Sequence, residues 1–155
     1  MSQSPCTSIS QADLDKSPAY QLWLVTNAWQ RRARRALEPL GLTHTQFIIL
    51  VSIDLLSGGA EPVTQAQVSR FAAIDENMTS QLMRTLEQNG LLERLHHPHD
   101  ARARVLSLTE EGRNHVIQAR KVLKPEKERM FECLGDRVGN LASMLAEVAA
   151  ANADN

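Results

Sequence analysis

Cysteine, aromatic residues and net charge are all scarce in this sequence. Its 155 residues include only two cysteines, Cys6 and Cys133, which are too few for a disulfide scaffold. Aromatic residues make up 4% of the chain, although hydrophobic residues as a whole make up 43%. A core must therefore be built mainly from aliphatic side chains. The length predicts one domain, or one domain with a dimerisation appendage.

Long apolar runs are also missing. No stretch approaches the ~18 residues needed to cross a bilayer. The N-terminus, MSQSPCTSISQADLDKSP, has neither the basic start nor the apolar core of a secretory signal. We therefore expect a cytoplasmic protein that does not enter a membrane. We interpret both cysteines as ordinary thiols. The alternative, an oxidant-sensing Cys6, lacks neighbours suited to lowering the pKa of the thiol.

Motifs for catalysis are absent as well. The sequence contains no Gly-rich phosphate loop, no nucleophile motif and no pair of carboxylates on a plausible scaffold. It therefore predicts neither an enzyme nor a cofactor. The formal net charge is −1, whereas nucleic-acid-binding surfaces are usually basic. A DNA-binding function must rest on where the charges lie, because the total charge does not favour it.

The first long helix is predicted to start at Ser17-Pro18, which combine an N-cap with proline at the first helical position. It follows a flexible arm, residues 1–16, and ends by residue 40. Between residues 20 and 29 it is apolar nearly all round, as in helices that are buried on several sides. A second subunit is the simplest way to bury it in so small a chain. Its second half carries three arginines that we interpret as a solvated face, with contacts to the DNA backbone as the alternative: Arg31, Arg34 and Arg35.

The next three helices form a helix-turn-helix pattern. Thr43 with Gln46, and Thr64 with Gln67, are spaced as capping boxes that open two of these helices. Asp75 can cap a third helix that ends at Asn89-Gly90. An apolar stripe on this third helix predicts its buried face: Met78, Leu82 and Leu86. Two helices separated by a short turn, the second amphipathic, are typical of helix-turn-helix proteins.

A hairpin and two further helices follow. The segments LLERL and RVLSL read as two short strands around the polar tip HHPHDARA; a hairpin in this position is a wing. A helix from residue 110 meets Pro125, which should kink or interrupt it, and ends near Gly135. The last helix, about residues 136–149, carries an apolar seam that we interpret as a dimer interface, with packing inside its own chain as the alternative: Val138, Leu141, Leu145 and Val148.

Two groups of side chains are candidates for DNA contact. The polar face of the third helix suits base edges, which Asn, Gln, Arg, Ser and Thr recognise by hydrogen bonds; its members are Asn77, Thr79, Ser80, Gln81 and Arg84. The wing tip adds a second group, in which Asp100 is placed to orient the guanidinium of Arg102: His97, Asp100, Arg102 and Arg104. An arginine on a narrow hairpin suits the minor groove.

The histidines of the wing permit a different interpretation. His96, His97 and His99 together with Asp100 could bind Zn²⁺, which favours imidazole ligands. Neighbouring residues of a strand point to opposite sides, however, and no fourth ligand has helical spacing. We therefore expect no metal site.

The order of these elements and several motifs resemble the multiple antibiotic resistance regulator (MarR) family. The similar segments are GLTHTQFIIL, VTQAQVSRFAAIDENMTSQLMRTLEQNGLLER and HDARARVLSLTEEGR, and the resemblance covers about residues 18–149. It implies a homodimer, joined by the N- and C-terminal helices, that recognises palindromic operators, usually in repression. Asp75, Glu76 and Arg84 depart from the residues usual in the family, which leaves the operator sequence open.

The resemblance also implies a small-molecule effector. Many members of the family release DNA when a small aromatic or phenolic ligand enters a crevice between the dimerisation and DNA-binding parts. By resemblance this crevice involves Trp23, Trp29, His44 and Phe47; the alternative is that these are core residues. A subset of the family senses peroxides through a cysteine in the first helix, and residues 18–38 contain none.

The sequence thus predicts a mainly α fold with a small β-hairpin wing. A winged helix-turn-helix DNA-binding region, residues 41–109, is flanked by dimerisation helices, 17–40 and 110–149, and followed by a disordered tail, 150–155. The predicted partners are double-stranded DNA, a second copy of the chain and a small effector. The alternative function is a winged-helix module for protein contacts that does not recognise DNA sequences.

Overall fold

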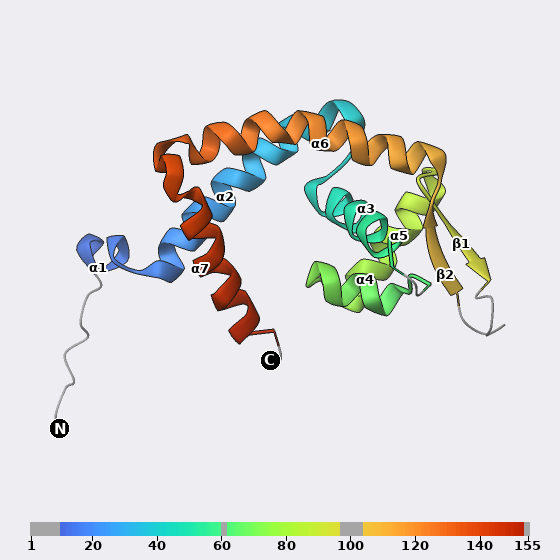
Figure 1. Ribbon diagram of the computed structural model, residues 1–155, viewed down its shortest axis with the longest axis horizontal. Helices are drawn as coiled ribbons and strands as arrows, with labels where there is room; N and C mark the ends of the chain where they lie inside the picture. Colours follow the sequence, from blue (N-terminus) through green and yellow to red (C-terminus); the bar gives the residue numbers. More distant parts are fainter. Residues whose placement is uncertain (1–9, 60–61, 97–103, 154–155) are drawn as a thin grey trace, which may run out of the picture.

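The computed structural model describes residues 10–59, 62–96 and 104–153. Within these ranges the chain forms α-helices, two short 3-10 helices and one hairpin (Figure 1). In chain order the elements are α1 (Gln11–Asp15), α2 (Pro18–Leu37), η1 (Glu38–Leu40), α3 (His44–Leu56), α4 (Gln65–Ala72), α5 (Glu76–Gln88), β1 (Leu92–His96), β2 (Arg104–Leu108), α6 (Glu110–Phe131), η2 (Glu132–Arg137) and α7 (Val138–Ala151). The predicted fold class is confirmed.

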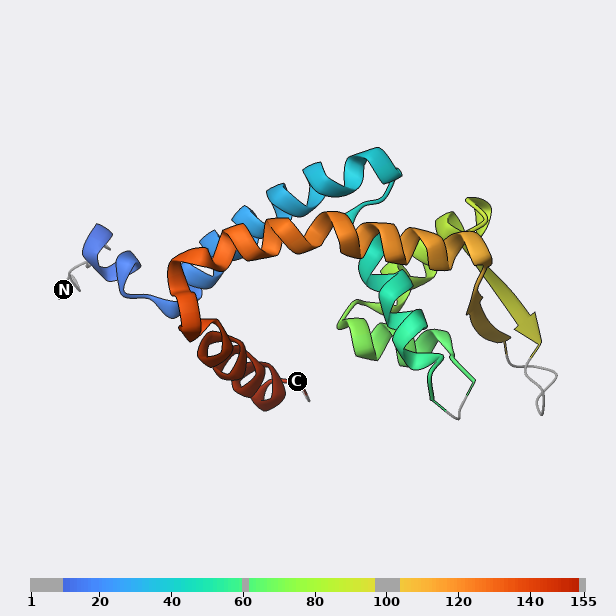
Figure 2. The same cartoon turned by 45° about the horizontal axis from the view of Figure 1, so that its top comes forward.

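The long helix α6 connects the two ends of the molecule. In Figures 1 and 2 its first half lies over α3, α5 and the hairpin, and its second half lies along α2 and leads to α7. The strands pair antiparallel with Leu92 opposite Leu108 and His96 opposite Arg104. Leu106 N–H donates to the Val63 carbonyl at 2.8 Å, which attaches the hairpin to the segment before α4.

The helix starts follow the predicted caps. The Ser17 hydroxyl accepts from the Tyr20 amide, and both capping boxes, Thr43 with Gln46 and Thr64 with Gln67, are formed. Asp75 accepts from the amides of Asn77 and Met78. Each of these bonds satisfies an amide that a helix N-terminus leaves without a partner.

The turn between α4 and α5 has an unusual backbone. Ala73 adopts φ 52° and ψ 43°, a left-handed conformation that favours glycine. The Ile74 amide donates to the Ser69 carbonyl at 3.1 Å, and the Ser69 hydroxyl donates to the Ile74 carbonyl. These reciprocal bonds hold the turn that sets the angle between α4 and α5.

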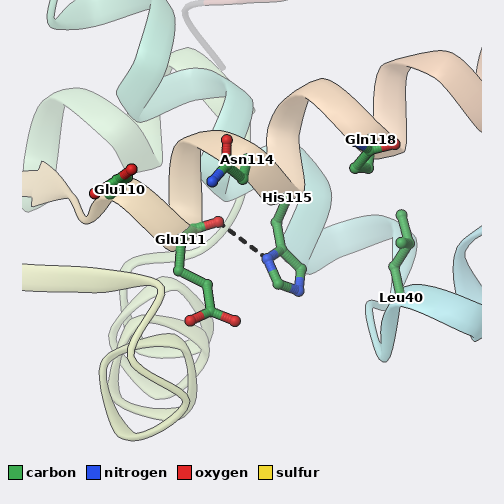
Figure 3. A pocket seen from close by; sticks show the side chains of 6 residues that line it. All are labelled: Leu40, Glu110, Glu111, Asn114, His115 and Gln118. Atoms are coloured by element: carbon green, nitrogen blue, oxygen red, sulfur yellow. Dashed lines mark hydrogen bonds between the residues drawn. The ribbon is translucent and has the colours of Figure 1, made fainter.

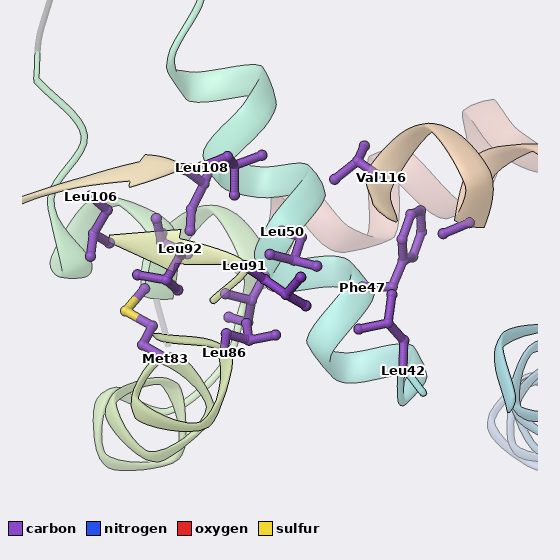
Figure 4. Packing of buried hydrophobic residues seen from close by; sticks show 14 of the residues in the cluster. Leu42, Phe47, Leu50, Met83, Leu86, Leu91, Leu92, Leu106, Leu108 and Val116 are labelled. Carbon is purple, nitrogen blue, oxygen red and sulfur yellow. The ribbon is translucent and has the colours of Figure 1, made fainter. Parts of the chain in front are cut away.

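The main core lies between α3, α5, the hairpin and the first half of α6 (Figure 4). Fully buried aliphatic side chains fill it: Ile49, Leu50, Ile53, Val68, Met83 and Leu86. Gly112 lets α6 approach this core, because a Cβ there would lie 1.9 Å from the backbone oxygen of Leu91. The start of α6 is thereby fixed against the segment that joins α5 to the hairpin.

Three details differ from the sequence predictions. The segment expected to be a flexible arm contains α1, whose cap Ser10 exchanges hydrogen bonds with Asp13. Pro125 neither ends nor interrupts α6, which continues to Phe131. Proline removes only one backbone bond of the helix, and contacts with the rest of the chain persist on both sides of it, through buried Leu123 and the bond from Arg32 to Glu126. Finally, α7 extends to Ala151, into the predicted tail.

Helices α2 and α7 leave apolar side chains exposed. No residue of α7 is buried, and Met144, Leu145 and Val148 are all exposed. Leu22, Trp23, Leu24 and Val25 of α2 are exposed as well. No single helix of the described residues is long and apolar enough to span a membrane; α2 with η1 and α3 reach that threshold only as a pair bent by 76°.

Candidate nucleic-acid interface

The outer face of α5 carries a row of exposed polar side chains. Asn77, Gln81 and Arg84 are spaced four and three residues apart and are all exposed, so they lie on one side of the helix. The opposite side is formed by Thr79, Met83 and Leu86, which are fully buried. One face of α5 is therefore fixed in the domain and the other is open, which is the arrangement that a recognition helix requires.

The prediction that Thr79 contacts DNA is wrong. Its side chain is 0% exposed, and its hydroxyl lies 3.4 Å from the Ile74 carbonyl, to which it donates. The predicted buried position Met78 is instead 53% exposed. A strict four-residue repeat drifts by about 40° per step around a helix of 3.6 residues per turn. The residues that stay against the core follow the spacing 79, 83, 86. Ser80 is half-buried beside them.

The wing is described only at its base. Arg104 and His96 are exposed and form the last pair of the hairpin. The Arg104 Nη1 atom lies 3.0 Å from Nδ1 and 2.9 Å from Nε2 of His96. The other predicted wing residues, His97, Asp100 and Arg102, lie outside the described residues. Within the described part of the chain, no three His, Cys, Asp or Glu side chains cluster to hold a metal ion.

An ion pair that sequence reasoning missed links the wing to α5. The Nε atom of Arg94 in β1 lies 3.2 Å from a carboxylate oxygen of Glu87 near the end of α5. The distance is that of an ion pair, but Nε and Nη2 of Arg94 are buried without a well-directed hydrogen bond among the described groups. The spacing of seven residues across a turn gives no helical or strand pattern that could have predicted it.

Three of the four predicted effector residues come together between α2 and α3. The rings of Trp29 and His44 meet edge to face with centroids 5.7 Å apart, and His44 stacks on Phe47 at 6.4 Å. The Trp29 indole N–H donates to Nε2 of His44 at 3.3 Å, which requires an unprotonated nitrogen there. Burial lowers the pKa of His44, because the charged imidazolium loses solvation.

Trp23 does not belong to this cluster. It is 60% exposed and stacks on Tyr20, with ring centroids 6.0 Å apart, at the other end of α2. The structure therefore does not bring Trp23 together with the other three predicted effector residues, and its role in effector binding stays a prediction. Residue 23 lies six residues before Trp29, which places it more than one helical turn away and on a different side of α2.

A hollow of about 450 Å³ lies next to Trp29 and Phe47, and α6 contributes its remaining lining. That lining is strongly basic: Arg120, Lys121, Leu123, Lys124 and Lys127. Sequence reasoning did not select these cations. Their spacing could have placed Arg120, Lys124 and Lys127 on one side of α6, but it could not bring them to Trp29.

A different hollow, of about 440 Å³, lies near the start of α6 (Figure 3). It is lined by Leu40, Glu110, Glu111, Asn114, His115 and Gln118. His115 Nδ1 lies 3.0 Å from the Glu111 carbonyl, so the ring donates its proton there. Two carboxylates make this hollow unsuited to phosphate groups, in contrast to the basic second half of α6.

Comparisons with known proteins agree with this arrangement. Residues 42–103 match the model of the MarR family. The chain is 37% identical over 115 residues to YdcH, an uncharacterised HTH-type transcriptional regulator of Bacillus subtilis, covering 74% of this chain and 78% of YdcH.

Two solved structures of a repressor, CouR, are also similar. One, bound to a 23-mer DNA duplex, is 27% identical with a TM-score of 0.80, covering 92% of this chain and 99% of that one. The other, from Rhodococcus jostii RHA1 and bound to p-coumaroyl-CoA, is 30% identical with a TM-score of 0.78, covering 90% of this chain and 96% of that one.

Proposed function

Because this chain belongs to the MarR family of transcriptional regulators, we propose that it represses transcription by binding a palindromic operator as a homodimer. A small anionic aromatic ligand is the signal that releases it. Its partner is duplex DNA, so the cytoplasm is its working compartment. One observation carries the proposal: Asn77, Gln81 and Arg84 form an exposed row on a helix whose other face is buried.

The chemistry of that row suits base recognition in the major groove. Asn and Gln can each make two hydrogen bonds to adenine, and Arg can make two to guanine. Asp75 and Glu76 at the start of α5 would repel phosphates, but Asp75 is occupied as the helix cap. Arg104 supplies positive charge at the base of the wing, and Arg102 and His97, together with Asp100, remain the proposed tip contacts.

The dimer is proposed from the exposed apolar side chains of α2 and α7. Fully burying an exposed apolar side chain is favourable by about 1.5–3 kcal/mol. Leu145 and Val148 are 44% and 60% exposed in the single chain, so a second copy would gain a part of this energy at each. A groove of about 470 Å³ between α6, η2 and α7 continues the same surface. Two copies joined there place two α5 helices in a symmetric pair, which a palindromic operator matches.

The effector is proposed to occupy the hollow beside Trp29 and Phe47. The aromatic side chains would pack on the ring of the ligand, and Arg120, Lys124 and Lys127 would neutralise a carboxylate or phosphate. An aromatic acid or its coenzyme A thioester has both features, and the similar repressor CouR was solved with such a thioester. Binding between α2, α3 and α6 would release DNA by changing the distance between the two α5 helices.

The operator is tested by selecting purified full-length protein against random duplex DNA at near-physiological salt. We expect enrichment of a two-fold symmetric site whose half-sites lie about one helical turn apart. If a folded dimer enriches no sequence, the operator proposal is wrong, and a module for protein contacts becomes the better explanation.

The effector is tested by tryptophan fluorescence in a Trp23→Phe background, where Trp29 is the only tryptophan. We expect an aromatic carboxylate to change the emission of Trp29 and its neutral amide to bind at least fivefold more weakly. Lys124→Gln should remove this preference, whereas Lys16→Gln, in the segment between α1 and α2, should leave it intact. Equal binding of acid and amide would contradict the proposed role of the cations.

A further inference from the structure

A second basic hollow lies between α2 and α6, apart from both the proposed effector site and the DNA-binding face. Its volume is about 590 Å³. It shares no lining residue with the hollow beside Trp29. Its lining comes from two helices and contains four arginines and one carboxylate: Ala28, Arg31, Arg32, Arg35 and Ala36 of α2, and Glu126 and Arg129 of α6.

The single carboxylate holds two of the arginines in place. Glu126 accepts from Arg32 Nη1 at 3.1 Å and from Arg129 Nη1 at 2.9 Å. Because Arg32 and Arg129 come from different helices, this bridge joins α2 to α6 at the hollow. Among the described residues, Arg31 and Arg35 form no ion pair. The hollow therefore keeps a strong excess of positive charge.

The positive charges of this hollow repel one another. Arg31 and Arg35 lie four residues apart on α2, a spacing at which like charges repel across one turn. The helix dipole favours Arg35, in the last turn of α2, and Arg129, in the last turn of α6. It does not account for Arg31 and Arg32, which lie earlier in α2. A bound anion would remove the repulsion.

We propose that this hollow binds a small phosphate-bearing ligand, with a nucleoside di- or triphosphate as the expected class. The planar guanidinium group matches phosphate oxygens in pairs, and it does so better than lysine. The volume is that of a small-molecule site. Ala28 and Ala36 flank the three arginines of α2 in the sequence, and their small side chains take up little of the hollow.

The position of the hollow argues against a role in DNA binding. Figures 1 and 2 show the second half of α6, with α2 alongside it, at the opposite end of α6 from the hairpin. A ligand bridging α2 and α6 would contact the helices that carry the proposed dimer surface. It would regulate the dimer, and it does not depend on the effector proposed above.

The test is titration calorimetry of the full-length protein with ATP, AMP and inorganic phosphate at constant ionic strength. We expect ATP to bind. Tighter binding of ATP than of phosphate identifies a nucleotide as the ligand, and equal binding identifies free phosphate. Arg35→Gln should weaken binding roughly tenfold, because a charge-assisted contact is lost. Arg34→Gln is the matched control: it is exposed in the same last turn but lines a different hollow, next to Thr43 and His44.

Three results would overturn the proposal. Absence of binding heat for every probe at millimolar concentration is the first. Equal weakening by Arg34→Gln and Arg35→Gln is the second, because it would reveal only diffuse attraction. The third is that Arg35→Gln loses as much affinity for a duplex of random sequence as it loses for ATP, because the arginines would then be DNA-backbone contacts. Both variants must sediment at the same rate as the wild-type protein, because only then do they share its oligomeric state.

Discussion

Replacing Ala73 by glycine is expected to stabilise the protein, although it removes a side chain from the turn before the recognition helix. Ala73 has φ 52°, and a non-glycine residue in this left-handed region costs about 1–2 kcal/mol. Glycine removes that cost but gives the unfolded chain more freedom, which offsets about 0.5–1 kcal/mol. The free energy of unfolding should therefore rise by about 0.5–1 kcal/mol, and Tm by roughly 1–4 °C.

The neighbouring alanine provides a control of opposite sign. Ala72 is the last residue of α4, and glycine in a helix lowers stability by about 0.5–1 kcal/mol relative to alanine. Both variants should be unfolded with urea at one fixed protein concentration, because association contributes to the stability of a dimer. If Ala73→Gly destabilises the protein as Ala72→Gly does, the left-handed turn does not limit stability and the reasoning fails.

Other substitutions separate the roles of individual side chains. Thr79→Ala should lower the free energy of unfolding by about 1–2 kcal/mol and leave base preference unchanged. Gln81→Ala should leave stability unchanged and lose about 1–3 kcal/mol of discrimination at one base pair. Urea unfolding measures the first quantity and competition binding the second, and equal behaviour of the two variants would contradict the assignment. Arg102→Ala should weaken binding to every duplex and reduce the salt dependence by about one unit; a change confined to one operator position would be inconsistent with a phosphate or groove contact. Burial lowers the pKa of His44 below 6.5 in the folded protein. On acidification the unfolded chain therefore takes up a proton at His44 before the folded protein does. The stability contributed by neutral His44 is present above about pH 6.5 and is lost as the pH falls toward the folded pKa. Unfolding of wild type and His44→Gln at pH 7.5 and pH 5.5 should therefore show a smaller loss in the variant, and parallel losses would refute this role.

The features that the sequence predicted well depend on residues close together in the chain. The capping boxes of Thr43 and Thr64 need only a polar residue three positions further on, and Asp75 accepts from the amides two and three positions further on. The hairpin follows from alternation over five residues on each side. Such signals are complete in the sequence, so the structure reproduces them.

The errors arise where burial is set by distant segments. The apolar stripe of α5 suggested Met78 as a core residue, but the turn at Ser69 and Ile74 covers Thr79 instead. The apolar pattern of α2 likewise could not show that Trp29 meets His44 whereas Trp23 does not.

Both basic hollows were missed for the same reason. Arg32 bonds to Glu126, 94 residues further along the chain, and Trp29 lines a hollow with Arg120 and Lys124. No spacing rule connects α2 to α6, because their alignment depends on how α3 and the core position α6. Charge patterns within one helix identify a basic face but not the side chains opposite it.

The most direct test of the central claim, that the outer face of α5 recognises base sequence, is a parallel selection of random duplex DNA with three proteins. These are the wild type, Arg84→Ala, and Arg34→Ala, which removes the same charge from α2. We expect a symmetric site for the wild type, the same site for Arg34→Ala, and loss of preference at one base pair in each half-site for Arg84→Ala. Recovery of the unchanged wild-type site by Arg84→Ala would contradict the claim.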